Sequence, residues 1–281
     1  PGNGNTAINQ GKYLAPFNDS NGDGNYNPYD GDYPDYDITG TKGCAARLFG
    51  DETLWWVFND KGNIHTETGA LEIGLELRAQ AFGFNTNDEI NNMTFYAYEV
   101  INRSSYTVSQ CYFGQWTDPD LGLYDDDFVG CDLARGLGFI YNGDADDGGG
   151  APGTYGLNPP SLGCDFFQGP LADSADGVDN DRNCIIDDVD INNNPSEQII
   201  MSKFVYYNND FTTTGNPETG TDFYNYLKGI WKDGTPFTYG GSGHATGVPC
   251  NFMFPGYSDQ LISWGTGGTC QTPFLPEIPW D

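Results

Sequence analysis

The chain has 281 residues and carries 40 acidic against 11 basic residues, which gives a formal net charge of −29. This charge disfavours nucleic acid and anionic membrane surfaces as partners and favours divalent cations. So acidic a chain can be disordered, but 18 Phe, 18 Tyr and 6 Trp supply the apolar surface of a core. No apolar run approaches the ~20 residues that span a bilayer. We therefore expect a folded chain with no membrane span.

The chain opens with an arm over residues 1–40 that is rich in Gly, Asn, Asp, Pro and Tyr. Residues 19–30 have the spacing of a calcium-binding loop, with oxygen donors at positions 1, 3, 5, 9 and 12, a glycine at position 6 and a backbone carbonyl at position 7. Alternate Asp and Asn side chains on such a loop converge on one point, and calcium prefers several hard oxygen ligands. Ordinary surface turns have a similar composition, which is the alternative. The predicted ligands are Asp19, Asn21, Asp23, Asn25, Asn27 and Asp30.

From residue 41 onward the pattern changes to short strand signals separated by Gly, Asn and Asp turns. Helical periodicity is scarce. The sequence therefore predicts an all-β fold, an antiparallel β-sandwich or jelly-roll-like core with long Gly/Asp/Asn-rich calcium-binding loops, forming a single unit over 41–281. The predicted strands lie at 54–58, 71–77, 93–101, 108–116, 136–141 and 198–207.

A loop insertion at about 142–196 contains a second stretch with calcium-loop spacing. Loops of this length are uncommon in compact domains unless a function or a ligand orders them. Cys184 stands where the first loop has glycine, so a turn that needs positive φ would be strained there. The predicted ligands are Asp179, Asp181, Asn183, Ile185 through its carbonyl, Asp187 and Asp190.

Six of the seven cysteines form pairs that are twenty positions apart. Local pairing is the simplest interpretation, and it implies an oxidising, extracellular setting. The chain has no C-x-x-C motif, which argues against a zinc ribbon or a thioredoxin-type site. Connectivity does not follow from spacing alone, and Cys44 is left over for a missing segment or another chain. The predicted disulfides are Cys111–Cys131, Cys164–Cys184 and Cys250–Cys270.

The search for catalytic chemistry gives little. His65 and His244 lie in glycine-rich loops without a nearby nucleophile, so hydrogen-bonded turn histidines are the expectation. With 40 acidic residues, pairs that resemble a glycosidase's two carboxylates arise by chance. Asp118, Asp120 and residues 125–127 form either a third cation site or a capped turn. We expect a protein that is not an enzyme.

Six segments together resemble large secreted cell-surface proteins of Bacteroidetes that are exported by the type IX secretion system. The resemblance covers most of the chain and implies export across the outer membrane, a larger parent protein and a calcium-stabilised β architecture. It also implies that Ser174, in Asp173-Ser174-Ala175, is an O-glycosylation candidate. The segments are 16–24, 30–34, 54–60, 89–95, 114–122 and 130–132.

These observations predict a secreted, calcium-stabilised structural or adhesive protein of the cell surface or extracellular matrix, for instance a subunit of an extracellular filament or sheath. Its expected partners are other copies of itself or other surface components, and its expected cofactor is Ca2+. The alternative is a carbohydrate-binding or glycoside-cleaving module, in which exposed Tyr and Trp side chains stack on sugar rings. An exposed aromatic platform beside a carboxylate pair would favour that alternative.

Overall fold

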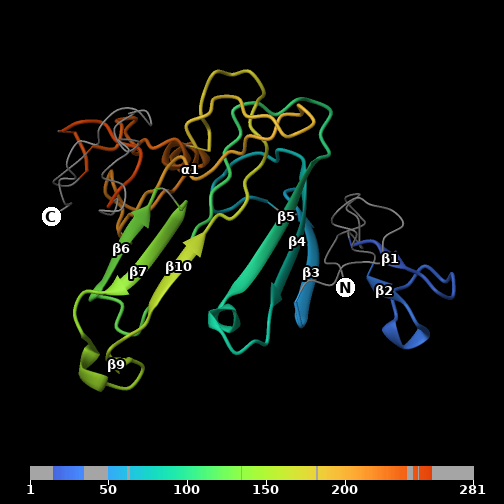
Figure 1. Cartoon of the computed structure of the whole chain (residues 1–281), viewed down its shortest axis with the longest axis horizontal. Coiled ribbons are helices and arrows are strands. Elements are labelled where there is room, and N and C mark those ends of the chain that lie inside the picture. Colours follow the sequence, from blue (N-terminus) through green and yellow to red (C-terminus); the bar gives the residue numbers. More distant parts are fainter. Residues whose placement is uncertain are drawn as a thin grey trace. The chain divides into compact units, whose positions relative to one another are not determined.

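The chain divides into two compact units, Pro1–Cys111 and Tyr112–Asp281, and each is described by itself. This division differs from the boundary at residue 40 that the change in composition suggested. Cys44 and Cys270 lie outside the residues that the structure describes. The computed structural model (Figure 1) describes residues 15–34, 50–61, 64–133, 135–181, 183–238, 243–245 and 247–254.

The first unit contains two antiparallel sheets among its described residues. The strands β1 (Phe17–Asn18) and β2 (Tyr33–Pro34) pair at the two ends of the first predicted calcium loop, and the 3-10 helix η2 (Pro28–Asp30) lies within the loop. The larger sheet has the order β3-β4-β5. Its strands are β3 (Glu52–Asn59), β4 (Leu75–Gly83) and β5 (Thr94–Asn102), with the 3-10 helix η3 (Glu89–Asn92) before β5.

The strands predicted at 54–58 and 93–101 are confirmed as β3 and β5, but the one predicted at 71–77 begins later. Gly74 has φ +91°, a left-handed conformation that interrupts an extended chain. The Asp60 carboxylate accepts hydrogen bonds from the backbone N–H groups of Ile73, Gly74 and Leu75 at this point. The strand therefore begins at Leu75, after Gly74, and continues through Ala79 and Ala81 to Gly83.

Both faces of the β3-β4-β5 sheet mix apolar and polar side chains. On one face, Arg78 and Arg103 each bond to the Glu76 carboxylate, and the hydrogen bond from Arg103 holds the pKa of Glu76 below its usual value. The fully buried Gln80 also lies on this face, in register with Trp55 and Ala97. The opposite face carries Glu52, Leu54, Trp56 and Phe58 of β3, Leu75, Leu77, Ala79 and Ala81 of β4, and Thr94, Tyr96, Tyr98, Val100 and Asn102 of β5.

The second unit contains a three-stranded antiparallel sheet with the order β10-β7-β6 and a small β8-β9 pair. The strand predicted at 136–141 is confirmed as β7, whereas the segments at 108–116 and 198–207 form no strand beyond isolated bridges. The aromatic residues of these two segments pack against loops instead, as Phe113 does against Phe166. The elements are β6 (Asp127–Asp132), β7 (Leu137–Asn142), β8 (Asp146–Asp147), η4 (Gly148–Gly150), β9 (Gly156–Leu157) and β10 (Ser161–Asp165).

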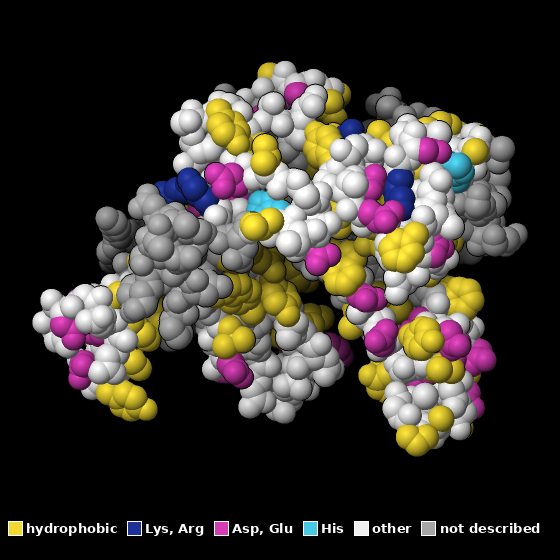
Figure 2. Space-filling model, turned by 180° about the vertical axis from the view of Figure 1, so that it is seen from behind, with side chains coloured by type: hydrophobic (Ala, Val, Ile, Leu, Met, Phe, Trp, Pro, Cys, Tyr) yellow, Lys and Arg dark blue, Asp and Glu magenta, His cyan; other side chains and the backbone are white. Residues whose placement is uncertain are grey.

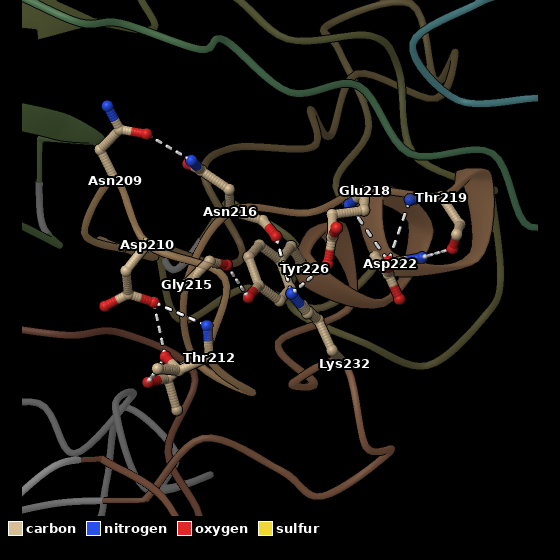
Figure 3. A network of polar contacts seen from close by, with 11 residues as sticks. Asn209, Asp210, Thr212, Gly215, Asn216, Glu218, Thr219, Asp222, Tyr226 and Lys232 are labelled. Atoms are coloured by element: carbon tan, nitrogen blue, oxygen red, sulfur yellow. Dashed lines mark hydrogen bonds and ion pairs between the residues drawn. The ribbon is translucent and has the colours of Figure 1, made fainter.

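One α-helix, α1 (Gly220–Leu227), lies among the described residues of the second unit. Thr219 and Asp222 form a capping box: the Thr219 hydroxyl accepts from the Asp222 N–H at 3.3 Å, and the Asp222 carboxylate accepts from the Thr219 N–H at 2.9 Å. Figure 3 shows the helix joined to the preceding loop through Tyr226, whose hydroxyl donates to the Gly215 carbonyl, while Lys232, beyond the end of the helix, donates to the Asn216 carbonyl of the same loop. This helix was not predicted, although its capping residues are visible in the sequence.

The main core lies in the second unit. Tyr226, Trp231 and Phe237 pack edge to face or tilted, and the Trp231 indole N–H donates to the Gly243 carbonyl at 2.7 Å. Phe252 is 1% exposed and packs with Cys131 and Leu133 near the end of β6. The all-β expectation is confirmed at the level of class, since the described elements are mostly antiparallel strands with little helix.

Candidate metal centre

The first predicted calcium loop is a ladder of side chain to backbone hydrogen bonds. The Asp19 carboxylate accepts from the N–H groups of Gly22 at 2.7 Å, Asp23 at 3.2 Å and Gly24 at 2.6 Å. Asn21 Oδ1 accepts from the Asp23 N–H at 3.0 Å, and Asp23 Oδ1 accepts from the Asn25 N–H at 2.7 Å. These bonds hold the pKa of Asp19 below its usual value, the bond from Gly24 most of all. The folded loop therefore favours the ionised form of the Asp19 carboxylate.

The second loop has the same ladder. Asp179 Oδ2 accepts from the Cys184 N–H at 3.0 Å, which corresponds to the bond between positions 1 and 6 of the first loop. Asp181 Oδ1 accepts from the Asn183 N–H at 3.1 Å, and Asn183 Oδ1 accepts from the Ile185 N–H at 2.8 Å. The two loops therefore share one pattern of backbone hydrogen bonds, from position 6 to 1, from 5 to 3 and from 7 to 5.

Cys184 has the left-handed backbone that the sequence suggested. Its φ is +75°, close to the +77° of Gly24 at the same loop position. A residue with a Cβ in this conformation costs roughly 1–2 kcal/mol. In spite of this cost, Cys184 adopts the conformation in which its backbone N–H donates to the Asp179 carboxylate.

The second loop gains a carboxylate that its own spacing does not include. Oxygens of Asp179, Asp181 and Glu197 lie within 4.8 Å of one another, and no other group of three or more such ligands occurs in the described part of the chain. Glu197 is held from outside the loop: its carbonyl accepts from the Ala172 N–H at 2.9 Å, next to a bridge between Leu171 and Gln198. The side chain reaches back into the loop, where Oε1 accepts from the Asn180 N–H.

Two oxygens of this cluster are buried without a hydrogen-bond partner. They are Asp179 Oδ1 and Glu197 Oε2, and Glu197 as a whole is only 4% exposed. Leaving a buried acceptor unsatisfied costs about 1–3 kcal/mol, and more when the group is charged. Because each carboxylate already uses its other oxygen on a backbone N–H, the two orphaned atoms remain available to a ligand.

The cluster also concentrates negative charge. Burial raises the pKa of Asp181, and the charges of Asp188, Asp179 and Glu197 raise it further. Three carboxylates at this spacing favour a cation at their centre. Calcium–oxygen distances are about 2.3–2.6 Å, so oxygens on one ion lie up to about 5 Å apart, which matches the spacing of the cluster. Asp179, Asp181 and Glu197 are the residues that would hold such an ion.

The other predicted ligands of the second loop have different partners. Asp187 accepts from the Gly177 N–H at 3.2 Å, and Asp190 accepts from the N–H groups of Asn192 and Asn194, each at 2.8 Å. The hydrogen bonds to Asn194 hold the pKa of Asp190 below its usual value. Asp190 therefore closes a following turn, and it is not one of the three clustered carboxylates.

The first loop does not bring three carboxylates together. Asp30 bonds to the Asn27 amide at 2.6 Å, and its side chain is exposed. Asp32, which the spacing did not include, is 4% exposed and accepts from the N–H groups of Ser20 and Asn27, both at 2.8 Å. Asp32 therefore ties the two ends of the loop together. Calcium binding at this loop stays a prediction.

Among the acidic residues at 118–127, Asp127 caps a turn. Asp127 Oδ2 accepts from the Leu121 N–H at 3.0 Å, and burial raises its pKa. The fully buried Asp147 accepts from the Leu123 N–H at 2.8 Å and from the Tyr155 N–H at 2.5 Å. Asp126 Oδ1 and Asp127 Oδ1 are buried without a hydrogen-bond partner, so the third cation site and the capped turn both stay predictions.

The histidines have the hydrogen bonds expected of turn residues. The ring nitrogens of His65 lie 3.1 Å from the Ala70 carbonyl and 2.6 Å from the Asp60 carbonyl. His244 Nε2 lies 2.7 Å from Asp233 Oδ2, and this contact lowers the pKa of Asp233 to about 2.

The predicted disulfides stay predictions. The structure contains no disulfide between the cysteines it describes. Cys131 is buried, and its thiol donates to the Met253 carbonyl at 3.2 Å, while Cys111 is exposed and falls in the other unit. Burial raises the pKa of Cys250 to about 12, and its predicted partner Cys270 lies outside the described residues. Ser174 is exposed, as a modification site requires.

Comparisons with protein-family models, with curated protein sequences and with solved structures gave no match for this chain. Among the helices of the described residues, none has the length and apolar character needed to cross a bilayer. The metal centre therefore rests on the geometry of the acidic loop alone.

Proposed function

We propose that this chain is a calcium-binding structural or adhesive protein of the extracellular space, in which a bound calcium ion orders the long acidic loop of the second unit. The observation that carries the proposal is the pair of buried, unpartnered oxygens of Asp179 and Glu197 beside Asp181. An ion at this point joins the loop at 179–185 to the bridged segment at 197. Binding of the ion stabilises a loop that has no regular secondary structure to order it.

The charge of the molecule supports an extracellular address. Extracellular calcium modules bind with Kd values of about 10⁻⁴–10⁻³ M, so they are loaded outside cells and empty where calcium is scarce. The net charge of −29 means that carboxylates outnumber basic side chains, and Figure 2 shows more Asp and Glu than Lys and Arg on one face. The resemblance to secreted Bacteroidetes surface proteins agrees with this address. The sandwich-like packing of the sheets and O-glycosylation at Ser174 belong to the same proposal.

The test is calcium titration of the purified chain by calorimetry, with magnesium as the comparison ion, followed by thermal unfolding in calcium and in EGTA. We expect saturable calcium binding and a higher Tm in calcium. A Tm that is equal in both solutions would remove calcium from the proposal.

Sedimentation and electron microscopy of the native parent protein, before and after chelation, test the structural role. We expect ordered assemblies that loosen when calcium is removed. Single particles of one size in both conditions would remove the structural role and leave calcium binding intact, and glycan binding and hydrolysis assays would then be the next step.

A further inference from the structure

We infer that Asp188 is a fourth carboxylate ligand of the calcium site, in the role that the loop spacing assigned to its neighbour Asp187. The inference rests on the proposed function, because it names a further ligand of the same ion. Asp187 stands at position 9 of the second loop and Asp188 at position 10. The hydrogen bonds of the two side chains connect Asp188 to the clustered carboxylates and give Asp187 a different partner.

The side chain of Asn183 links Asp188 to the cluster. Its amide nitrogen donates to Asp181 Oδ2 at 3.1 Å and to Asp188 Oδ2 at 2.5 Å. By the sum of these two distances, the two carboxylate oxygens are at most 5.6 Å apart. Oxygens on one calcium ion lie up to about 5 Å apart, so a small rotation of either side chain brings both oxygens onto one ion. Asp188 therefore lies just outside the 4.8 Å cluster and within reach of it.

The electrostatic environment of Asp181 also places Asp188 close by. Burial raises the pKa of Asp181 most, and among the neighbouring charges that of Asp188 raises it more than those of Asp179 and Glu197 do. The charge of Asp188 thus acts on Asp181 at least as strongly as the charges of the two carboxylates already in the cluster.

The backbone holds Asp188 and Glu197 on one short ladder. The Asp188 carbonyl accepts from the Ser196 N–H at 3.0 Å, and an antiparallel bridge between the residues at 189 and 195 follows directly. Ser196 immediately precedes Glu197, which carries one of the buried oxygens without a partner. The other two carboxylates come from the start of the loop. An ion bound by all four carboxylates therefore joins the start of the loop to this ladder.

Asp187 has a separate role. Both of its carboxylate oxygens face the Gly177 N–H, at 3.2 Å and 3.4 Å. Gly177 precedes the first ligand of the loop, so this contact ties the end of the loop to the residues before it. Asp187 itself has a left-handed backbone with φ +55°, a conformation that Asp tolerates better than most residues. We therefore expect Asp187 to contribute to stability and not to calcium affinity.

The test is calcium calorimetry and thermal unfolding of Asp188→Asn, with Asp187→Asn as the matched control. The two residues are adjacent and both half-buried, and the two substitutions remove the same charge. We expect calcium affinity to fall about 10-fold in Asp188→Asn, because the number of charged ligands tunes the affinity of a calcium site. Its Tm in EGTA should be equal to or higher than that of the wild type, since a carboxylate that repels its neighbours is gone and an amide oxygen still accepts from Asn183. Asp187→Asn should keep near-wild-type affinity and lose Tm in both solutions.

Asp188→Glu keeps the charge and provides a second variant should Asp188→Asn not fold. We expect it to bind calcium more tightly than Asp188→Asn does, or, without that comparison, more tightly than apoprotein repulsion alone allows when Asp188→Ala is measured beside it. An affinity that Asp188→Asn leaves unchanged, or that Asp187→Asn lowers equally, would overturn this inference and leave the proposed calcium site intact. An equal loss of Tm in calcium and in EGTA for Asp188→Asn would make Asp188 a structural residue and would also overturn it. A wild type that binds no calcium would remove the proposed function and this inference together.

Discussion

Replacing Glu197 with Gln should change the stability of the chain in opposite directions with and without calcium. The carboxylate of Glu197 lies within 4.8 Å of oxygens of both Asp179 and Asp181. At that distance two unit charges repel by about 3 kcal/mol for an effective dielectric constant of about 20. Solvent reaches the partly exposed Asp179 and Asp181, so we discount the sum over both pairs to about 2–3 kcal/mol.

Without calcium, Glu197→Gln removes this repulsion and keeps the carbonyl that accepts from the Asn180 N–H. The Tm in EGTA should therefore be equal to or higher than that of the wild type. With calcium, the variant lacks one of the charged ligands, and calcium affinity should fall about 10- to 100-fold, which corresponds to about 1.4–2.8 kcal/mol. The rise in Tm that calcium produces should shrink accordingly.

The measurements are calcium calorimetry and differential scanning calorimetry in calcium and in EGTA. Glu67→Gln is the control, because Glu67 is exposed outside the site and the change of charge is the same. A purely structural role for Glu197 predicts equal losses in both solutions. An unchanged calcium affinity would refute the assignment of the site to this cluster.

Asp190→Asn tests whether Asp190 is a calcium ligand, as the loop spacing predicted, or only caps a turn, as its hydrogen bonds indicate. Asp190 bonds to the N–H groups of Asn192 and Asn194, so its replacement should reduce stability slightly in both solutions and leave calcium affinity near the wild-type value. A fall in affinity as large as that of Glu197→Gln would restore Asp190 as a ligand.

Three further substitutions test other parts of the structure. Cys184→Gly should stabilise the reduced protein by about 0.5–1 kcal/mol in denaturant unfolding, because φ is +75° at this position; a loss of several kcal/mol in the oxidised protein alone would instead reveal a disulfide. Gly122→Ala should destabilise by about 2 kcal/mol or more, since an added Cβ lies 1.8 Å from Asp147 Oδ2 and φ is +85°; Gly149→Ala, which has open space, is its control. Glu76 has a lowered pKa, so its ion pairs contribute stability above the unfolded pKa of about 4.5 that is lost as pH falls through the folded value. The deficit of Glu76→Gln in free energy of unfolding should thus shrink below pH 4.5, and a constant deficit would contradict this.

Local chemistry made the loop ladders predictable from the sequence. The bonds from position 6 to position 1, from 5 to 3 and from 7 to 5 join residues that are at most five positions apart, so the spacing of Asp, Asn and Gly determines them. The positive φ of Cys184 was predictable for the same reason, because it follows from the position of Cys184 in the loop. Strands with clear alternation, β3 and β5, were predictable for the same reason.

The parts that sequence reasoning missed depend on distant partners. Glu197 joins the carboxylate cluster of Asp179 and Asp181 because the segment that contains it bridges to Leu171, and no local spacing indicates that contact. The aromatic segment at 198–207 has the sequence pattern of a strand. In the structure, however, Phe204 packs against Gly138 and against the core of the second unit, and the segment does not join the sheet. The helix α1 had a local signal in its capping box, which the scarcity of helical periodicity elsewhere obscured.

A calcium ion at the proposed site would offset part of the repulsion that a net charge of −29 creates. A site with a Kd of about 10⁻⁴ M in about 10⁻³ M calcium gains RT ln(1 + [L]/Kd), about 1.4 kcal/mol, and almost nothing when calcium is scarce. That gain is a sizeable part of a marginal folding free energy. In this proposal, folding of the acidic loop is coupled to the calcium concentration of the surroundings.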